Sequence, residues 1–169
     1  DTPRGITTDG TKLYVTDHDG HKIRKIVIST GAVTTLAGSG SQGSTNATGT
    51  SARFNAPRGI TKVGTNLYVA DSDNHLIRKV VISTGAVTTF AGSTSSGSTD
   101  ATGTSARFNK PRAITTDGTN LYVVDNSNHK IRKIVISTGV VTTLAGSSKG
   151  CQAAAGTTAA YNNQQGMIA

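Results

Sequence analysis

The sequence predicts an all-β protein built from repeated antiparallel units, and three observations lead to this prediction. The 169 residues contain a repeat of 54 residues, marked by prolines at positions 3, 57 and 111. Short segments rich in β-branched residues alternate with turn residues, which is typical of strands. The chain has few aromatic residues, namely four Tyr, three Phe and no Trp, whereas 20 of its residues are glycine. This composition favours thin sheets with many turns over a helical core.

The repeat is nearly exact. Residues 3–56 and 57–110 differ at 13 of 54 positions, which leaves 41 identical. Residues 57–96 and 111–150 differ at 13 of 40 positions, which leaves 27 identical. Self-similarity at this period indicates a solenoid, a propeller or another array, and it takes precedence over any local prediction.

Each unit contains four strand signals separated by turn residues. In the second unit we expect strands over residues 58–62, 66–71, 75–83 and 86–91. The third of these holds Ile77, Val80, Val81 and Ile82, an almost continuous β-branched run. Both faces of such a strand must be covered, as they are between stacked sheets. Four antiparallel strands per repeat, stacked face to face, is the plan of a β-propeller blade.

The residues around the second and third strands resemble the NHL repeat. The triplet Asn74-His75-Leu76 spells the letters of its name, and the segments 57–60, 66–71 and 77–79 resemble its blade consensus. The first unit has Gly20 in place of Asn74. The near-identity of the units is similar to that of bacterial extracellular NHL arrays, and the resemblance implies a propeller at the cell surface or outside the cell.

We assign blade 1 with its long connecting loop to residues 3–56, blade 2 with its loop to 57–110, and blade 3 to 111–146. Residues 147–169 are interpreted as a loop and the degenerate start of a fourth blade. Three blades cannot close a ring, because closed propellers have about four to eight. We therefore expect a segment of a longer array, or alternatively a homodimer that closes a six-bladed ring.

An acidic turn precedes the third strand of each unit, as in DSDNHLIRKV at residues 71–80. The repeated aspartates are Asp17, Asp71 and Asp125, and the histidines are His21, His75 and His129. A calcium loop needs about six oxygen ligands and a terminal bidentate Glu, which this turn lacks. Histidines in separate blades would not converge on one zinc ion. We therefore predict structural turns without a metal, with a left-handed residue at the position of Gly20 and Asn74.

The Arg-Lys pairs of the third strands suggest a buried ion pair. Neighbouring residues of a strand point to opposite faces, so one of each pair can lie between blades. There, the arginine could bond the aspartate that ends the second strand. Phe54 and Phe108 are predicted to be plugs between blades.

Five arginines lie at the face of the predicted propeller that carries the long connecting loops. They stand at the ends of the long loops or at the entrance of the first strands: Arg4, Arg58, Arg112, Arg53 and Arg107. Long loops on a rigid scaffold commonly carry binding sites. With a net charge of +8, this face could attract acidic glycans or RNA, or the charge could serve solubility alone. Because few aromatics are available to stack on bases, nucleic acid is not the favoured partner.

We expect a non-catalytic binding or surface-scaffold module, with a protein or glycan ligand on the long-loop face. No cofactor is expected. The first alternative is a polyanion binder that uses the arginine-rich face. The second is a metal-dependent propeller enzyme of the lyase or lactonase type, although the first strands carry no carboxylates or histidines and near-identical blades argue against an active site. The sequence contains no run of about 18 apolar residues, so it predicts no membrane-spanning helix.

Overall fold

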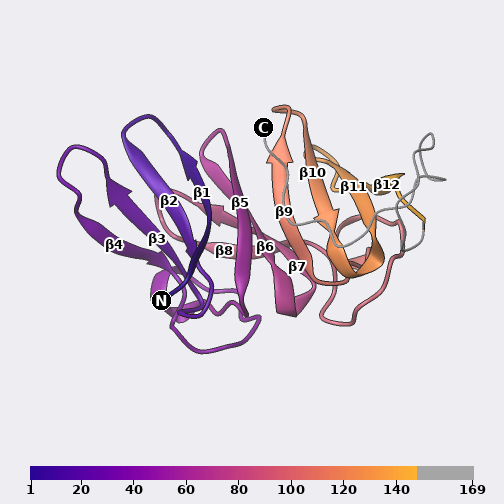
Figure 1. The fold of residues 1–169 in the computed structure, drawn as a ribbon, viewed down its shortest axis with the longest axis horizontal. Helices are drawn as coiled ribbons and strands as arrows, with labels where there is room; N and C mark the ends of the chain where they lie inside the picture. Colours follow the sequence, from indigo (N-terminus) through magenta and orange to yellow (C-terminus); the bar gives the residue numbers. More distant parts are fainter. Residues whose placement is uncertain (148–169) are drawn as a thin grey trace.

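A computed structural model of the chain describes residues 1–147, and these residues form three separate four-stranded sheets. Figure 1 shows the sheets side by side, in the order in which they occur in the sequence. We call them blade 1 (residues 3–37), blade 2 (57–91) and blade 3 (111–145). The predicted start of a fourth blade falls almost wholly on residues 148–169, outside the described residues.

Every blade has the same four strands. Blade 1 contains β1 (Pro3–Thr8), β2 (Lys12–Asp17), β3 (Lys22–Val27) and β4 (Val33–Ala37). Blade 2 contains β5 (Pro57–Val63), β6 (Asn66–Asp71), β7 (Leu76–Val81) and β8 (Val87–Ala91). Blade 3 contains β9 (Pro111–Thr116), β10 (Asn120–Asp125), β11 (Lys130–Val135) and β12 (Val141–Ala145). Four short 3-10 turns complete the structure: η1 (Gly49–Ser51), η2 (Ser72–Asn74), η3 (Gly103–Ser105) and η4 (Asn126–Asn128).

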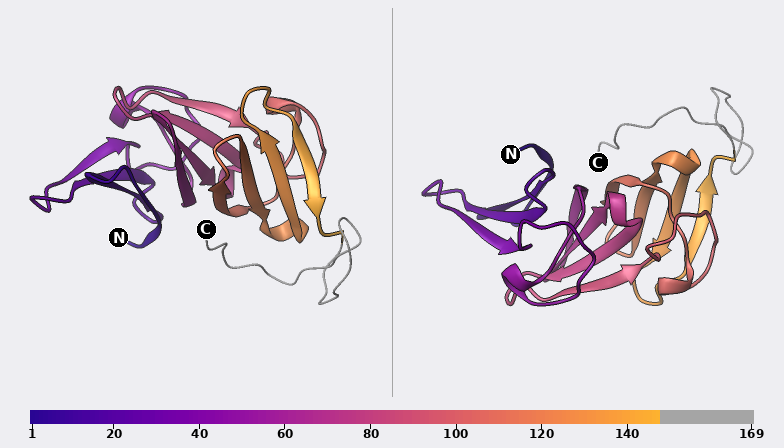
Figure 2. Two further views of the ribbon diagram at one scale, coloured as in Figure 1. Left: turned by 90° about the horizontal axis from the view of Figure 1, so that it is seen from above. Right: turned by 90° about the horizontal axis from the view of Figure 1, so that it is seen from below.

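Each sheet is an antiparallel meander in which the strands pair in chain order. The first strands of adjacent blades contact one another, β1 with β5 and β5 with β9, so they form the innermost layer of the fan. Blade 2 lies between the other two in the views of Figure 2. The arrangement confirms the prediction of an all-β protein with propeller blades.

The strands expected from the sequence of the second unit agree with β5 to β8 within about two residues. The principal difference concerns the third strand, which was expected to begin at His75. The structure starts β7 at Leu76 and places His75 in the preceding turn with a left-handed backbone.

Two apolar cores lie between the blades rather than within them. The first joins side chains of blade 1 and its loop to the facing side chains of blade 2: Tyr14, Ile23, Leu36, Ala37, Ala52, Phe54, Ile60, Leu67, Val69, Val80 and Val87. The second repeats this set between blades 2 and 3. Because blade 2 contributes both of its faces to these cores, its strands need apolar residues on both sides, as the β-branched run of the third strand indicated.

The long connecting loops cross the face of the blade that follows them. In the first loop, the Val87 N–H of β8 donates to the Ala47 carbonyl at 2.8 Å, so the loop pairs with the outer edge of blade 2. Phe54, near the end of the same loop, is fully buried between blades 1 and 2. Phe108 occupies the same place in the second core. Both phenylalanines are therefore the inter-blade plugs that the sequence predicted.

Candidate functional site

A buried ion pair fastens each connecting loop to the next blade. Arg78 of β7 is fully buried, and its Nη1 donates to Oδ2 of Asp71 at 2.8 Å and to the carbonyl of Arg53 at 3.0 Å. Its Nη2 donates to the Thr45 carbonyl at 3.2 Å and to Oδ1 of Asn46 at 2.8 Å. The guanidinium also lies 5.2 Å from the centroid of the Phe54 ring. One side chain therefore binds the loop at two places, near its middle at Thr45 and Asn46 and near its end at Arg53.

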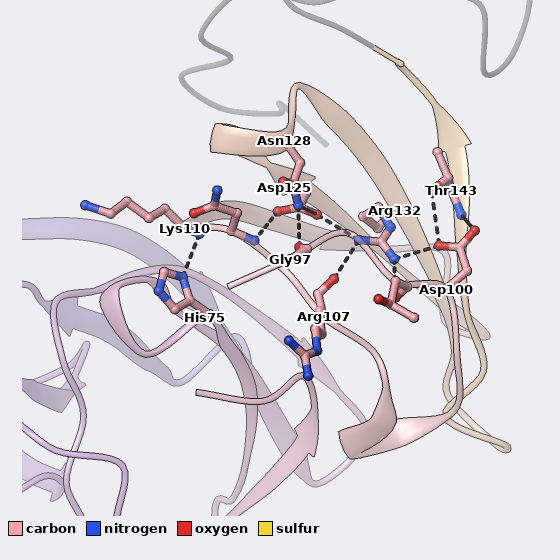
Figure 3. Close-up of polar contacts among 11 residues, drawn as sticks. His75, Gly97, Asp100, Arg107, Lys110, Asp125, Asn128, Arg132 and Thr143 are labelled. Carbon is pink, nitrogen blue, oxygen red and sulfur yellow. Dashed lines mark hydrogen bonds and ion pairs between the residues drawn. The ribbon is translucent and has the colours of Figure 1, made fainter. Parts of the chain in front are cut away.

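Blade 3 repeats this arrangement, which Figure 3 shows in detail. Arg132 donates to Asp125 Oδ2 at 2.8 Å and to the Arg107 carbonyl at 2.9 Å. Here Asp100 replaces Asn46, and its Oδ1 lies 2.6 Å from Nη2 of Arg132. The predicted ion pair between the third-strand arginine and the second-strand aspartate is thus confirmed in blades 2 and 3.

The aspartates of these pairs are held by main-chain and amide donors as well. Oδ1 of Asp71 accepts from the Asn55 N–H at 2.7 Å, and Oδ2 accepts from the Asn74 amide at 2.8 Å. Burial raises the pKa of Asp71 to about 6, and the neighbouring Arg78 charge opposes this shift. Both carboxylate oxygens of Asp71 are therefore occupied by protein donors.

The histidines, rather than the residues before them, adopt the left-handed conformation. His75 has φ 61° and ψ 29°, and His21 and His129 also have positive φ. The prediction that Gly20 and Asn74 occupy this conformation was wrong. The Asn74 side chain instead bonds Asp71 and the Gly43 carbonyl, at 2.7 Å for the latter. Gly20 leaves no room for such a side chain, because a Cβ there would lie 2.5 Å from Asp17 Oδ2.

Two of these histidines also join neighbouring blades. Nδ1 of His21 accepts from the Ala56 N–H at 3.1 Å, and Nδ1 of His75 accepts from the Lys110 N–H at 3.1 Å. Both donors stand directly before the proline that opens the next blade. Nδ1 of His129 is buried without a hydrogen-bond partner among residues 1–147. The left-handed backbone aims the ring at the following blade, and no residue pattern in the sequence indicated this role.

The His75 contact predicts a dependence of stability on pH. Burial lowers the pKa of His75, the Asp73 charge opposes this shift, and the Lys110 charge adds to it. Because the folded-state pKa lies below the unfolded value of about 6.5, the contribution is complete above that pH and is lost as pH falls through the folded-state pKa. Denaturant unfolding between pH 7.5 and 5 should show this contribution of His75 as a slope, a free energy of unfolding that falls as pH falls. The His75→Asn variant, whose Oδ1 can replace Nδ1 as acceptor, should flatten it; an unchanged slope would contradict the role of the ring.

The arginines at the entrances of the innermost strands lie in β-bulges. In blade 2 the register between β5 and β6 shifts between Pro57 and Ile60, so that Arg58 and Gly59 together oppose one residue of β6. The same shift occurs in blades 1 and 3. A bulge bends the strand and redirects the side chains of its extra residue. The sequence alone did not reveal the bulges.

Close contact between the innermost strands brings these arginines together. A Cβ on Gly59 would lie 2.6 Å from the carbonyl oxygen of Arg112 and 2.8 Å from the Cα of Ala113, so only glycine fits there. Gly5 meets the Arg58 carbonyl in the same way. The backbones of adjacent blades therefore touch where the arginines begin.

The resulting group, which we call the arginine cluster, consists of Arg4, Arg58 and Arg112. Burial lowers the pKa of Arg58, and the positive charges of Arg112 and Arg4 lower it further. Asp73 and Asp19, from the turns before β7 and β3, act in the opposite direction. Arg58 therefore lies within electrostatic reach of two like charges, and this arrangement favours the binding of an anion.

Arg53 and Arg107 do not share the position of the arginine cluster. Their side chains are exposed and lie along the loops, against Gly43 and Gly97 respectively. Their main-chain carbonyls accept from the buried arginines Arg78 and Arg132. Of the five predicted face residues, the structure thus groups three.

The possible metal ligands within residues 1–147 lie apart from one another. In this part of the chain, no three His, Cys, Asp or Glu side chains come together as a metal site would require. The same residues include no helix of the length and apolar character needed to cross a membrane.

Comparison with known proteins places the chain among propellers. Human NHL repeat-containing protein 2 is 33% identical over 144 residues, which cover 78% of this chain and 20% of that protein. An auxiliary nutrient binding protein from Bacteroides ovatus has 25% identity and a TM-score of 0.66, over 79% of this chain and 35% of the other. A second auxiliary nutrient binding protein, from Bacteroides thetaiotaomicron, has 18% identity and a TM-score of 0.70, over 96% and 41%. No family model matches the chain.

The repeated four-stranded sheets, packed through their innermost strands, define a segment of a β-propeller. With its Asn-His-Leu turn and the relatives just described, the chain belongs to the NHL-repeat family of β-propellers. It spans about a fifth of the length of the curated NHL relatives that it matches.

Proposed function

We propose that the chain is part of a non-catalytic binding module and that its ligand is an acidic glycan bound at the arginine cluster. One observation carries this proposal: the bulges of β1, β5 and β9 place Arg4, Arg58 and Arg112 at equivalent positions on innermost strands that contact one another, β1 with β5 and β5 with β9. Burial lowers the pKa of Arg58, and the positive charges of Arg112 and Arg4 lower it further. A bound carboxylate would relieve that repulsion.

Arginine suits such a ligand. Its planar guanidinium presents donors in a fork that matches both oxygens of a carboxylate. Hydrogen bonds with ionised partners are shorter and stronger than neutral ones. The guanidinium groups of the cluster can therefore hold an anion by charge and by hydrogen bonds.

A glycan is favoured over RNA because the two connecting loops offer no exposed aromatic side chain. Recognition of single-stranded RNA relies on exposed aromatic or guanidinium planes that stack on bases. Phe54 and Phe108, the aromatic residues of the connecting loops, are both fully buried. An acidic sugar needs only charged donors and hydroxyl contacts.

The proposal extends to partner and location. Auxiliary nutrient binding proteins of Bacteroides share the fold, and this supports a binding role. The near-identity of the units, which is similar to that of bacterial extracellular NHL arrays, supports a location outside a bacterial cell, where acidic glycans occur. An arginine cluster binds charge but supplies neither a nucleophile nor a general base, which supports a non-catalytic role. Metal analysis of the purified protein would decide against this role if it found a stoichiometric bound ion.

The test compares two arginines of equal charge. Calorimetric titration with oligogalacturonate should show binding that weakens as salt is added, because exposed charges are screened. Arg58→Gln should weaken binding roughly 10- to 100-fold, the range expected for loss of charge-assisted hydrogen bonds. Arg53→Gln removes the same charge from an exposed loop outside the cluster and should change the affinity by less than about two-fold.

Two results would contradict the proposal. Equal losses in the Arg58→Gln and Arg53→Gln variants would mean that net charge alone attracts the glycan. Binding of poly-U but not of oligogalacturonate would replace the glycan with RNA as the ligand.

A further inference from the structure

A buried hydroxyl group joins two of the bulges that carry the arginine cluster. The register of β1 against β2 shifts between Pro3 and Ile6, so that Arg4 and Gly5 together oppose Thr16 of β2. In such a bulge the ladder of main-chain hydrogen bonds is interrupted, and the extra residue needs another partner. Thr16 is fully buried at this place.

The Thr16 hydroxyl bonds the main chain of two blades. Its oxygen accepts from the N–H of Gly5, the neighbour of Arg4 in the bulge of blade 1, at 2.8 Å. It donates to the carbonyl of Arg58, in the bulge of blade 2, at 2.5 Å. The carbonyl of Gly5 lies farther away, at 3.4 Å. One hydroxyl group thus links the main chain beside Arg4 to that of Arg58.

The repeat itself does not require this hydroxyl. Ala70 occupies the position of Thr16 in blade 2, and Val124 occupies it in blade 3. Both are buried, and neither has a hydroxyl group. Blades therefore fold with an apolar residue at this position, and the link made by Thr16 is an addition to the common plan.

We propose that Thr16 is a positioning residue of the arginine cluster, which holds Arg4 and Arg58 at the separation that the acidic glycan requires. This inference rests on the proposed function. Because Thr16 is buried, it acts on the ligand only through the two arginines. A site whose groups are already in place loses less conformational freedom when it binds, and this raises its affinity.

A double-mutant cycle tests this role. Calorimetric titrations with oligogalacturonate compare the parent chain, Thr16→Val, Arg4→Gln and the double variant, at a temperature where circular dichroism shows each chain to be folded. Valine keeps the shape of threonine and is the natural residue of blade 3. Thr16→Val should weaken binding roughly three- to ten-fold, the range for coupled neighbours. In the Arg4→Gln chain, the same change should cost less than about two-fold.

Two further variants make the result specific to the hydroxyl. Thr16→Ser keeps the hydroxyl and should bind within about two-fold of the parent chain. If Thr16→Val does not fold, Thr16→Ala, which introduces the residue of blade 2, replaces it in the cycle. A threonine that served stability alone would lower the unfolding temperature when replaced, but the affinity of the folded chain would stay the same.

The outcomes separate this inference from the proposed function. The inference alone is overturned if Arg58→Gln weakens binding but Thr16→Val does not, or if Thr16→Val costs the same affinity with and without Arg4. A loss in Thr16→Ser equal to that in Thr16→Val would also overturn it, because the hydroxyl would then not be the cause. Absence of oligogalacturonate binding by the parent chain would overturn the proposed function and this inference together.

Discussion

Replacing Arg78 with alanine is expected to lower the free energy of unfolding by about 3–5 kcal/mol, the range for breaking a buried ion pair at one partner. The substitution leaves Asp71 buried without its counter-charge. It also removes the donors that hold the Arg53 and Thr45 carbonyls of the connecting loop. Denaturant unfolding of the 169-residue chain measures the loss.

Blade 1 supplies the control for this prediction. Arg24 stands in the same Ile-Arg-Lys triplet of the repeat, but within residues 1–147 its side chain makes none of the bonds that the Arg78 side chain makes. Arg24→Ala should therefore change stability by less than about 0.5 kcal/mol, as is usual for surface positions. If the two variants lost equal stability, the loop contacts of Arg78 would not account for its contribution.

The Gly59→Ala variant is expected to destabilise the chain by about 1–3 kcal/mol or more, the usual cost of overpacking. The added methyl would collide with three backbone atoms of β9, namely the Arg112 oxygen at 2.6 Å and the Ala113 Cα and Ile114 nitrogen, both at 2.8 Å. Backbone cannot rotate away as a side chain can, so β5 and β9 must separate. The same separation should weaken glycan binding, because it spreads the arginine cluster.

The reverse substitution in blade 3 controls for the intrinsic preferences of glycine and alanine. Ala113 occupies the position of Gly59 in the repeat. Ala113→Gly should cost about 0.4–1 kcal/mol through the greater freedom of the unfolded chain, without a change in glycan affinity. Thermal unfolding and the oligogalacturonate titration measure both effects. A Gly59→Ala variant as stable as the parent chain would show that the innermost strands do not touch.

The fold could be predicted because its information is local and repeated. The β-branched run at Ile77 to Ile82 required cover on both faces, and the 54-residue period required that neighbouring units supply it. The buried Arg78–Asp71 pair also followed from strand alternation. Such features depend on residue type and spacing, and both recur in every copy of the repeat.

The features that the sequence did not reveal depend on backbone geometry or on the neighbouring unit. The left-handed conformation was expected at Asn74, since asparagine favours it, but tertiary contacts assign it to His75 and use the ring to bond Lys110. The bulge at Arg58 was not predicted, although an isolated glycine inside a strand, here Gly59, can mark a bulge. Identical residues also differ in environment, since Arg24 and Arg78 share a repeat position yet only Arg78 meets a preceding loop.

Hydrogen exchange at three valines tests most directly whether each connecting loop completes the blade that follows it. Val33 and Val87 lie in the same local sequence, Thr-Gly-Ala-Val-Thr-Thr, so their unprotected amides should exchange at nearly equal rates. Val87 and Val141 donate to loop carbonyls at 2.8 and 2.9 Å. Residue-resolved amide hydrogen exchange of the 169-residue chain should therefore be slow at Val87 and Val141 and at least about ten-fold faster at Val33. Equal exchange at all three valines would contradict the account.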